Sequence, residues 1–398
     1  MDLLKGHAMN DVKELLARMS AIGASDLILT VGAPPQYRVL GVLRTEAKEV
    51  VTAADAERLV FSLLNESQAQ HLRTQRSIDF SKGFEGLTRF RFNIYYQRDS
   101  LAMAARLIPN RIPSFKELGL PEIIRDFALR PHGLVLVTGP AGSGKSTTLA
   151  AMIDYINTQR HAHVICLEDP IEYLHAHRTS VIDQREIYAD APSFTDALRS
   201  VFRQSPDVIM IGEMRDIETM QLALTLAETG HLILATLHTQ DTVHAIHRIV
   251  DVFPPAHQQQ VYTQLSMVLS GVISQALLLT MDQARRVLAY ELMNVNNAIR
   301  NMIRERQLQQ VYSVMQTGKA EGMVTMNESL KRMVSQGLLD QDVALERSPR
   351  PRELARMLGV AMRETSVLNH GDGEGITEDI KWDTRTTVLS GGPEHERV

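Results

Sequence analysis

The sequence is poor in cysteine, and Cys166 is the one thiol among its 398 residues. A single thiol cannot form an intramolecular disulfide, and it cannot supply the thiolate pairs of a zinc ribbon. These limits are typical of a protein that is made and kept in a reducing compartment. We therefore expect a cytoplasmic protein.

Aromatic and basic residues are also scarce. Aromatic residues make up 5% of the chain, and 42 lysines and arginines stand against 47 acidic residues, which gives a net charge of -5. Proteins that hold nucleic acids use a positive field or an aromatic channel for the strand. The composition therefore predicts no nucleic-acid partner.

Long apolar runs are missing as well. The longest, Leu134 to Val137 and Ala276 to Leu279, are far shorter than the roughly 20 residues that span a bilayer. The N-terminal stretch MDLLKGHAMNDVKELL mixes acids and bases and lacks the apolar core of a signal peptide. We expect neither a transmembrane helix nor a secretory signal.

The chain is long enough for two or three domains, and residues 1–110 predict a small α+β domain. Helical periodicity runs from Val12 to Met19 and recurs over residues 53–64 and 67–72, while strand-like runs cover residues 27–31, 37–43 and 89–96. Two prolines within residues 108–113 interrupt the pattern. We place a linker at residues 111–116.

Residues 117–345 predict an α/β domain. Segments of helical period separate four apolar runs, LVLVTG, VICLEDP, DVIMIGE and HLILATLHT. Strands that are apolar along their whole length are buried on both faces, as in a parallel sheet with crossover helices. From Gln258 to about Gln336 the pattern favours helix. The last 28 residues hold seven acids and three bases, so we expect disorder over residues 346–398.

The clearest motif follows the first of these strands. Gly139 to Ser146 reads GPAGSGKS, a GxxxxGK[ST] loop between a strand and a helix. In such loops, backbone N–H groups surround a phosphate, the lysine reaches the β- and γ-phosphate oxygens, and the hydroxyl ligates Mg²⁺. A plain glycine-rich turn is the alternative, which the flanking strand and helix disfavour. We predict binding of ATP and Mg²⁺, with Ser146 as the metal ligand, through Gly142, Ser143, Gly144, Lys145, Ser146 and Thr147.

Hydrolysis also needs a carboxylate that orients and deprotonates water at the carboxyl edge of the sheet. Glu213 ends the run DVIMIGE and is the candidate base. The acid that usually precedes such a glutamate is missing, because Gly212 occupies its position. In LEDPIE, three acids including Glu168 follow another strand. Either a metal-bound nucleotide compensates their charge, or they form a solvated turn.

Histidines stand at both ends of the run HLILATLH. His231 and His238 are seven positions apart on one straight strand, too far to ligate one metal ion, so we exclude zinc. His238 either lies beside the phosphates or is only hydrogen-bonded at the strand end, and the residues alone weigh these two interpretations evenly.

Arginines in the N-terminal domain are further candidates. Arg91 and Arg106 either stabilise charge on a transferring phosphoryl group across an interface or lie on a solvated strand face. Arg89 and Arg98 fit the second interpretation.

In order and spacing, the motifs GPAGSGKSTTLAAMIDYIN, LEDPIEYLH, SPDVIMIGEMRDIET and TGHLILATLHT resemble the secretion-type hexameric ATPases, specifically the type IV pilus retraction (twitching motility) branch. The segments ASDLILTVGAPPQYRVLG and RFRFNIYYQR resemble that family's PAS-like N-terminal domain, and AIRNMIRE resembles its C-terminal helical motif. The resemblance covers roughly residues 12–340.

The resemblance implies a PAS-like domain followed by a RecA-like P-loop domain, and a cytoplasmic homo-hexamer at the inner-membrane face of the pilus machine. It implies an inner-membrane platform protein and a second retraction ATPase as partners. Glu213 then matches the catalytic glutamate and Glu168 the acidic box. The histidine box and the arginine-finger pair correspond to His231, His238, Arg91 and Arg106.

Three other functions stay open at this stage. A pilus-assembly or type II secretion ATPase usually carries a further N-terminal domain and a four-cysteine zinc insert, and the single cysteine disfavours it. An accessory retraction subunit would share all the motifs. A nucleic-acid-dependent ATPase is disfavoured by the acidic, aromatic-poor composition.

Overall fold

The computed structural model describes residues 11–360 apart from residues 40, 47 and 110. The chain divides into two compact units. One comprises the described residues up to Ser114 together with Ile124–Gly133 and Ser146–Ala235, and the other comprises Phe115–Ile123, Leu134–Lys145 and the described residues from Thr236 onward. The chain therefore passes from one unit to the other several times.

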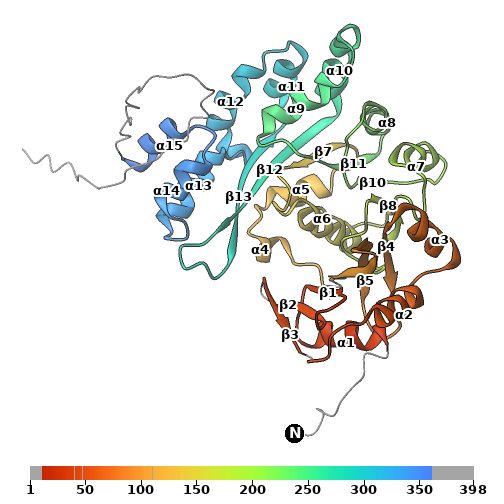
Figure 1. Ribbon diagram of the computed structural model, residues 1–398. Helices are drawn as coiled ribbons and strands as arrows, with labels where there is room; N and C mark the ends of the chain where they lie inside the picture. Colours follow the sequence, from red (N-terminus) through yellow and green to blue (C-terminus); the bar gives the residue numbers. More distant parts are fainter. Residues whose placement is uncertain (1–10, 40, 47, 110, 361–398) are drawn as a thin grey trace, which may run out of the picture. The chain divides into compact units, whose positions relative to one another are not determined.

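The N-terminal part of the chain forms a six-stranded antiparallel sheet in the order β3-β2-β1-β6-β5-β4 (Figure 1). Its elements are α1 (Val12–Ala21), β1 (Asp26–Thr30), β2 (Gln36–Val39), β3 (Val42–Thr45), α2 (Ala53–Leu63), α3 (Glu66–Gln75), β4 (Ser77–Gly83), β5 (Arg89–Gln97) and β6 (Ser100–Ile108). The expected single strand over residues 37–43 is instead the pair β2 and β3, because Gly41 has φ 84° and turns the chain.

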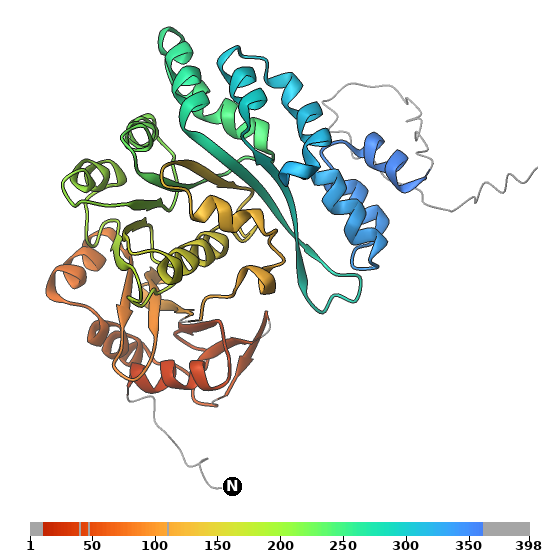
Figure 2. The same ribbon diagram turned by 180° about the vertical axis from the view of Figure 1, so that it is seen from behind.

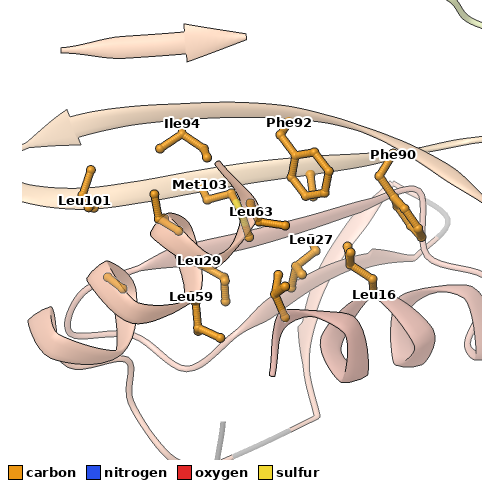
Figure 3. Packing of buried hydrophobic residues seen from close by; sticks show 14 of the residues in the cluster. Leu16, Leu27, Leu29, Leu59, Leu63, Phe90, Phe92, Ile94, Leu101 and Met103 are labelled. Atoms are coloured by element: carbon orange, nitrogen blue, oxygen red, sulfur yellow. The ribbon is translucent and has the colours of Figure 1, made fainter. Parts of the chain in front are cut away.

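Alternation along β5 builds the core of this sheet. Phe90, Phe92 and Ile94 are buried, while the residues between them are half-buried. In Figure 3 these three side chains point toward helices α1 and α2, from which Leu16 and Leu59 approach. The ring of Phe92 stacks on Phe80 with 5.2 Å between their centroids. The other face of β5 is left for polar side chains.

The second sheet has seven strands in the order β13-β12-β7-β11-β10-β8-β9. Pairs β10–β11, β10–β8, β8–β9 and β12–β7 are parallel, and β12–β13 is antiparallel. Its first elements are α4 (Phe115–Leu118), α5 (Ile123–Ala128), β7 (Gly133–Thr138), α6 (Lys145–Gln159), β8 (His163–Glu168), β9 (Val181–Glu186), α7 (Phe194–Val201), β10 (Val208–Ile211), α8 (Ile217–Glu228) and β11 (Leu232–Leu237). The four apolar runs of the sequence are the strands β7, β8, β10 and β11, and the α/β fold is confirmed.

The expectation of helix from Gln258 to Gln336 is wrong for two segments. Strands β12 (Leu269–Leu279) and β13 (Arg286–Asn294) form a long hairpin there, which Figure 2 shows from behind. A continuous apolar run is compatible with a buried helix or a buried strand. The parallel pairing of β12 with β7 decides for strand.

Helices surround this hairpin in the second unit. They are α9 (Thr242–Asp251), α10 (Pro255–Val268), α11 (Asn297–Arg304), α12 (Val311–Thr317), α13 (Met326–Ser335), α14 (Gln341–Arg347) and α15 (Pro351–Leu358), with the short 3₁₀ turns η1 (Leu308–Gln310) and η2 (Gly318–Glu321). Helices α13 to α15 pack in one apolar cluster with Leu278 of β12 and Ala289 of β13. The motif AIRNMIRE lies on α11, as its helical pattern predicts.

The expectation of disorder from residue 346 is wrong for α15. Leu354 and Ala355 of this helix are buried, and Arg350 lies 3.6 Å from the ring centroid of Tyr312. The charged residues around Leu354 and Ala355 make the short apolar face of this helix difficult to recognise from the sequence. Residues 361–398, to which the same expectation applies, lie outside the described residues.

Within the described ranges, the structure contains no helix that is both long and apolar enough to cross a membrane.

The packing of β5 generates a stability prediction. Replacing Phe92 by alanine is expected to lower the free energy of unfolding of the N-terminal sheet by about 3–5 kcal/mol, because the buried ring leaves a cavity. Tyr95→Ala, a control on the same strand, removes an exposed ring and should cost less than about 1 kcal/mol. Hydrogen exchange of the β5 and β6 amides in the full-length protein measures both changes. Equal losses would contradict this core.

Candidate active site

The loop between β7 and α6 requires glycine at several positions. Gly139, Gly142 and Gly144 have φ angles of +140°, +75° and +91°, which side-chain-bearing residues rarely adopt. At Gly139, a Cβ atom would also lie 2.4 Å from the carbonyl oxygen of Gln275 and 2.6 Å from Ser143 Oγ. The start of the loop is therefore pressed against β12, and only glycine fits there.

Lys145 turns its cation back into this loop. Its Nζ donates hydrogen bonds to the carbonyl oxygens of Gly139 and Pro140, each 2.9 Å away. Ser143 Oγ is buried and, among the described residues, has no hydrogen-bond partner. A buried ammonium next to a buried hydroxyl without a partner is a site for an anion with several acceptor oxygens. A phosphate group fits this description.

Two hydroxyl residues stand in the first turn of α6. Ser146 and Thr147 are both half-buried. Thr147 Oγ1 lies 3.0 Å from the hydroxyl of Tyr173, which follows the acidic segment LEDPIE. This hydrogen bond ties the start of α6 to the acidic segment. Ser146 presents an oxygen ligand of the kind that Mg²⁺ prefers.

Glu168 is the last residue of β8, and its side chain is almost completely buried. Burial is the main cause that raises the pKa of this carboxyl to about 7, and hydrogen bonds from Gln184 and from the backbone N–H of Glu172 oppose the rise. Gln184 Nε2 lies 3.0 Å from Glu168 Oε1, and the Glu172 nitrogen lies 3.3 Å from Oε2. Because the carboxyl is buried and hydrogen-bonded, the interpretation as a solvated turn does not hold for Glu168.

Glu213 lies at the next strand end. Strand β10 pairs in parallel with β8 up to Ile211 and Leu167, and the N–H of Gly212 donates to the carbonyl of Leu167 at 2.8 Å. A Cβ at Gly212 would lie 3.1 Å from that carbonyl oxygen. The missing acid before Glu213 thus has a steric reason, because the backbone of β8 leaves little room for a side chain there. The sheet brings the strand ends of Glu168 and Glu213 side by side.

The carboxylate of Glu213 is largely shielded and forms an ion pair with Arg215, whose own side chain is exposed. Only Met214 separates them in the segment GEMRD. The arginine therefore contacts the candidate base directly. Arg215 is not among the residues predicted from the sequence, although its position two residues after Glu213 is a signal for it.

The two candidate arginines face each other on neighbouring strands. Arg91 of β5 and Arg106 of β6 are register partners. Arg106 Nε lies 2.7 Å from Asp26 Oδ1, and the nearest contact of Arg91 is with Asp79 at 3.8 Å. Their side chains are 42% and 68% exposed for Arg91 and Arg106, respectively. The pair of Arg91 with Asp79 is exposed, and such pairs hold an arginine only weakly. Arg106 instead donates a short hydrogen bond to Asp26, whose side chain is only 13% exposed.

Arg89 does not lie on a solvated strand face, and that interpretation is wrong. Its guanidinium lies 3.5 Å from Glu186 Oε2, and the Glu186 side chain is only 5% exposed. The ion pair joins β5 of the N-terminal sheet to β9 of the second sheet, within one compact unit. Arg98, whose φ is 46°, lies in the two-residue turn between β5 and β6.

The two histidines stand at opposite ends of β11. His231 precedes the strand, where its Nδ1 lies 3.0 Å from the carbonyl oxygen of Leu226. His238 follows the strand and is exposed. Because β11 runs parallel to β10, His231 is at the amino edge of the sheet, and Glu168 and Glu213 are at the carboxyl edge. The structure does not bring His231 together with the two carboxylates.

Gln184 is a second residue that the sequence analysis missed. Besides holding Glu168, its Nε2 donates to the carbonyl of Tyr173 at 2.7 Å, and its Oε1 accepts from the His175 N–H at 2.9 Å. One amide thus fixes both the carboxylate and the loop that follows it. Nothing in the sequence of β9 distinguishes this glutamine, because its partners are brought together only by the parallel pairing of β8 and β9.

Comparisons with known proteins agree with these motifs. Residues 110–356 match the family described as type II/IV secretion system protein. The chain is 43% identical over 341 residues to the type IV pilus retraction ATPase PilT of Pseudomonas aeruginosa, which covers 86% of this chain and 99% of PilT. It is 37% identical over 374 residues to the type IV pilus ATPase PilU of the same organism, over 93% of this chain and 98% of PilU.

A solved structure supports the fold as well. The crystal structure of the pilus retraction motor PilT with bound ADP is similar with a TM-score of 0.83 at 48% sequence identity, over 87% of this chain and 99% of that chain. The likeness extends over the N-terminal α+β domain and the following P-loop domain, so the predicted fold class is confirmed. Together with the matched length of the relatives, it shows that the chain belongs to the type II/IV secretion system protein family.

Proposed function

We propose that this protein is an ATPase, which hydrolyses Mg-ATP to ADP and phosphate and uses the reaction to power type IV pilus retraction. The loop after β7 carries the proposal: three glycines at positive φ, an inward-turned lysine and a buried serine hydroxyl form a cradle for phosphate oxygens. The relatives support the same reaction. PilT of Pseudomonas aeruginosa is named as a pilus retraction ATPase, and the solved PilT structure holds ADP.

We assign the binding of the triphosphate to the loop and the first turn of α6. Lys145 exchanges the two loop carbonyls for phosphate oxygens, and Ser143 Oγ gains an acceptor. Gly142, Gly144 and Thr147 contribute backbone N–H groups. Ser146 holds Mg²⁺, which, when bound, offsets phosphate charge and polarises the γ-phosphoryl group.

Glu213 is the proposed general base, which accepts a proton from the attacking water. Arg215 holds its carboxylate at the end of β10 until the substrate is present. Glu168 is proposed as a second carboxylate of the active site, in addition to Glu213. Its pKa of about 7 lets a bound cation convert it to the charged form at neutral pH. His238 is proposed to contact the phosphates, and for His231 the catalytic role stays a prediction.

Arg91 and Arg106 are proposed to complete the site of a neighbouring subunit in a homo-hexamer. Both side chains are substantially exposed, and a phosphoryl group would have to compete with Asp79 for Arg91 and with Asp26 for Arg106. Movement of the N-terminal domain, residues 1–110, against residues 117–345 about the linker 111–116 would then convert hydrolysis into work.

The proposed setting is the cytoplasmic side of the inner membrane, at the base of the pilus machine. An inner-membrane platform protein is the proposed partner for force transfer, and a second retraction ATPase is a further one. An accessory retraction subunit is the second candidate function, because the chain is also 37% identical to a second pilus ATPase, PilU. Purified protein that hydrolyses ATP alone, together with loss of twitching in a deletion strain, would support the main motor. Nucleotide binding without turnover would support the accessory subunit.

Glu213→Gln tests the reaction. The amide cannot accept a proton, so ATP turnover should fall at least about 100-fold while ATP affinity stays within about threefold. Glu218→Gln is the matched control, because this exposed glutamate lies in the first turn of α8, just after the same strand. Steady-state turnover and binding of a fluorescent ATP analogue measure both variants. A variant that hydrolyses ATP within a few-fold of the parent would remove Glu213 from its assigned role.

Arg106→Ala tests the contribution from a neighbouring subunit. Turnover should fall at least about 10-fold with unchanged nucleotide affinity, because the lost group stabilises only the charge of the transition state. Arg38→Ala is the control. Arg38 lies on β2, and its Nε is 3.6 Å from Oδ2 of the same Asp26. If both variants lose turnover equally, the effect comes from freeing Asp26 and not from a missing catalytic arginine.

A further inference from the structure

Glu291 is a buried carboxylate that the proposed reaction does not use. It lies on β13, and its side chain is almost completely shielded from water. Its Oε1 accepts hydrogen bonds from the Thr242 N–H at 2.9 Å and from the Thr242 hydroxyl at 2.8 Å. Its Oε2 accepts from the Met326 N–H at 3.3 Å. Each oxygen therefore binds a different segment of the chain.

Both segments are the first residues of helices. Thr242 begins α9 and Met326 begins α13. Each helix also has its own cap, because Asp241 accepts from the His244 N–H and Thr325 accepts from the Glu328 N–H. Glu291 binds the N–H groups that these caps leave over, and its charge is favourable at two positive helix ends. It links the starts of α9 and α13 through one side chain.

The neighbouring strand extends this link to the phosphate loop. Ser274 of β12 is the register partner of Glu291, and its hydroxyl donates to the carbonyl of Gln240 at 2.7 Å. The next residue, Gln275, has the carbonyl oxygen that lies 2.4 Å from the position of a Cβ at Gly139. All of these residues belong to one compact unit. Strand β12 therefore contacts both the segment 238–242, through Gln240, and the start of the phosphate loop, at Gly139, while Glu291 joins Thr242 of that segment to α13.

We infer that Glu291 is a positioning residue that connects the segment 238–242 to α13, so that the occupancy of the phosphate loop alters the start of the C-terminal helices. The inference rests on the proposed function, because it needs a nucleotide at that loop. If nucleotide binding moves the segment 238–242, the Glu291 side chain would move with Thr242, to which Oε1 is hydrogen-bonded. The hydrogen bond from the Met326 N–H to Oε2 would then change as well, which would alter the start of α13. Helices α13 to α15 share one apolar cluster, so they would respond together.

The chemistry of the carboxylate supplies a selective variant. In Glu291→Gln, one oxygen becomes an NH₂ donor, which cannot accept from an N–H. The remaining oxygen is expected to face Thr242, where it keeps two hydrogen bonds, and the NH₂ group would then face the Met326 N–H. The variant is therefore expected to cut the link to α13 and to keep the link to α9.

Hydrogen exchange of the full-length protein with and without ADP tests this inference. In the parent, ADP should slow exchange at least about fivefold in residues 239–246 and also in residues 325–331. In Glu291→Gln, the slowing should persist in the first segment and vanish in the second. The matched control is Glu328→Gln, which weakens the cap of α13 without touching α9, and it should keep both responses. A merely structural role would raise exchange of α13 equally with and without ADP.

The outcomes separate the two proposals. Failure of the parent to bind ADP would overturn the proposed function and this inference together. Binding of ADP with no response at residues 325–331 in the parent, or with an unchanged response in Glu291→Gln, would overturn the inference alone. If Glu291→Gln does not fold, Thr242→Val removes the hydroxyl bond from the other side and should reduce the response at α13 at least about twofold. An undiminished response in that variant would also overturn the inference.

Discussion

Burial of whole strands dictates where this protein can place charge. Every residue of β7, β10 and β11 is buried, and an ionised side chain within such a strand would lose its water without recovering equivalent partners. The candidate functional groups therefore collect at strand ends: Glu168 ends β8, Glu213 follows β10, His238 follows β11, and the phosphate loop follows β7. The burial that excludes charge from β7, β10 and β11 thus leaves the segments after these strands as the places for polar groups.

A buried carboxylate near these ends persists only where the fold provides donors for it. Gln184 and a backbone N–H serve Glu168, Arg89 serves Glu186, and two helix starts serve Glu291. The balance differs between them, since burial still raises the pKa of Glu168 to about 7 and also raises the pKa of Glu291. These carboxylates connect strands to the segments around them, and each holds a specific arrangement of chain that apolar packing alone would leave less defined.

The two faces of the N-terminal sheet differ: one packs into the hydrophobic core, and the other carries polar side chains. Strand β5 alternates aromatic residues that fill the core with residues such as Arg91 that point away from it. Pairing with β6 then sets Arg91 opposite Arg106. The two arginines thus lie next to each other on strands whose opposite face packs into the core.

The sequence by itself determined the phosphate loop, the apolar parallel strands, the N-terminal α+β organisation and the strand ends that carry Glu168 and Glu213, because these depend on local pattern and on glycine's freedom at positive φ. It did not determine the hairpin of β12 and β13 or the helix α15. Whether an apolar run forms a strand or a helix, and whether a charged segment folds at all, depends on the element against which it packs. Arg215 stands only two positions after Glu213, so its pairing is local. The partners Gln184 and Glu186, and the helix starts that Glu291 binds, come from residues distant in sequence or unremarkable in pattern. Tertiary structure decided them, because a buried polar group is satisfied by whichever donor the fold brings within about 3 Å.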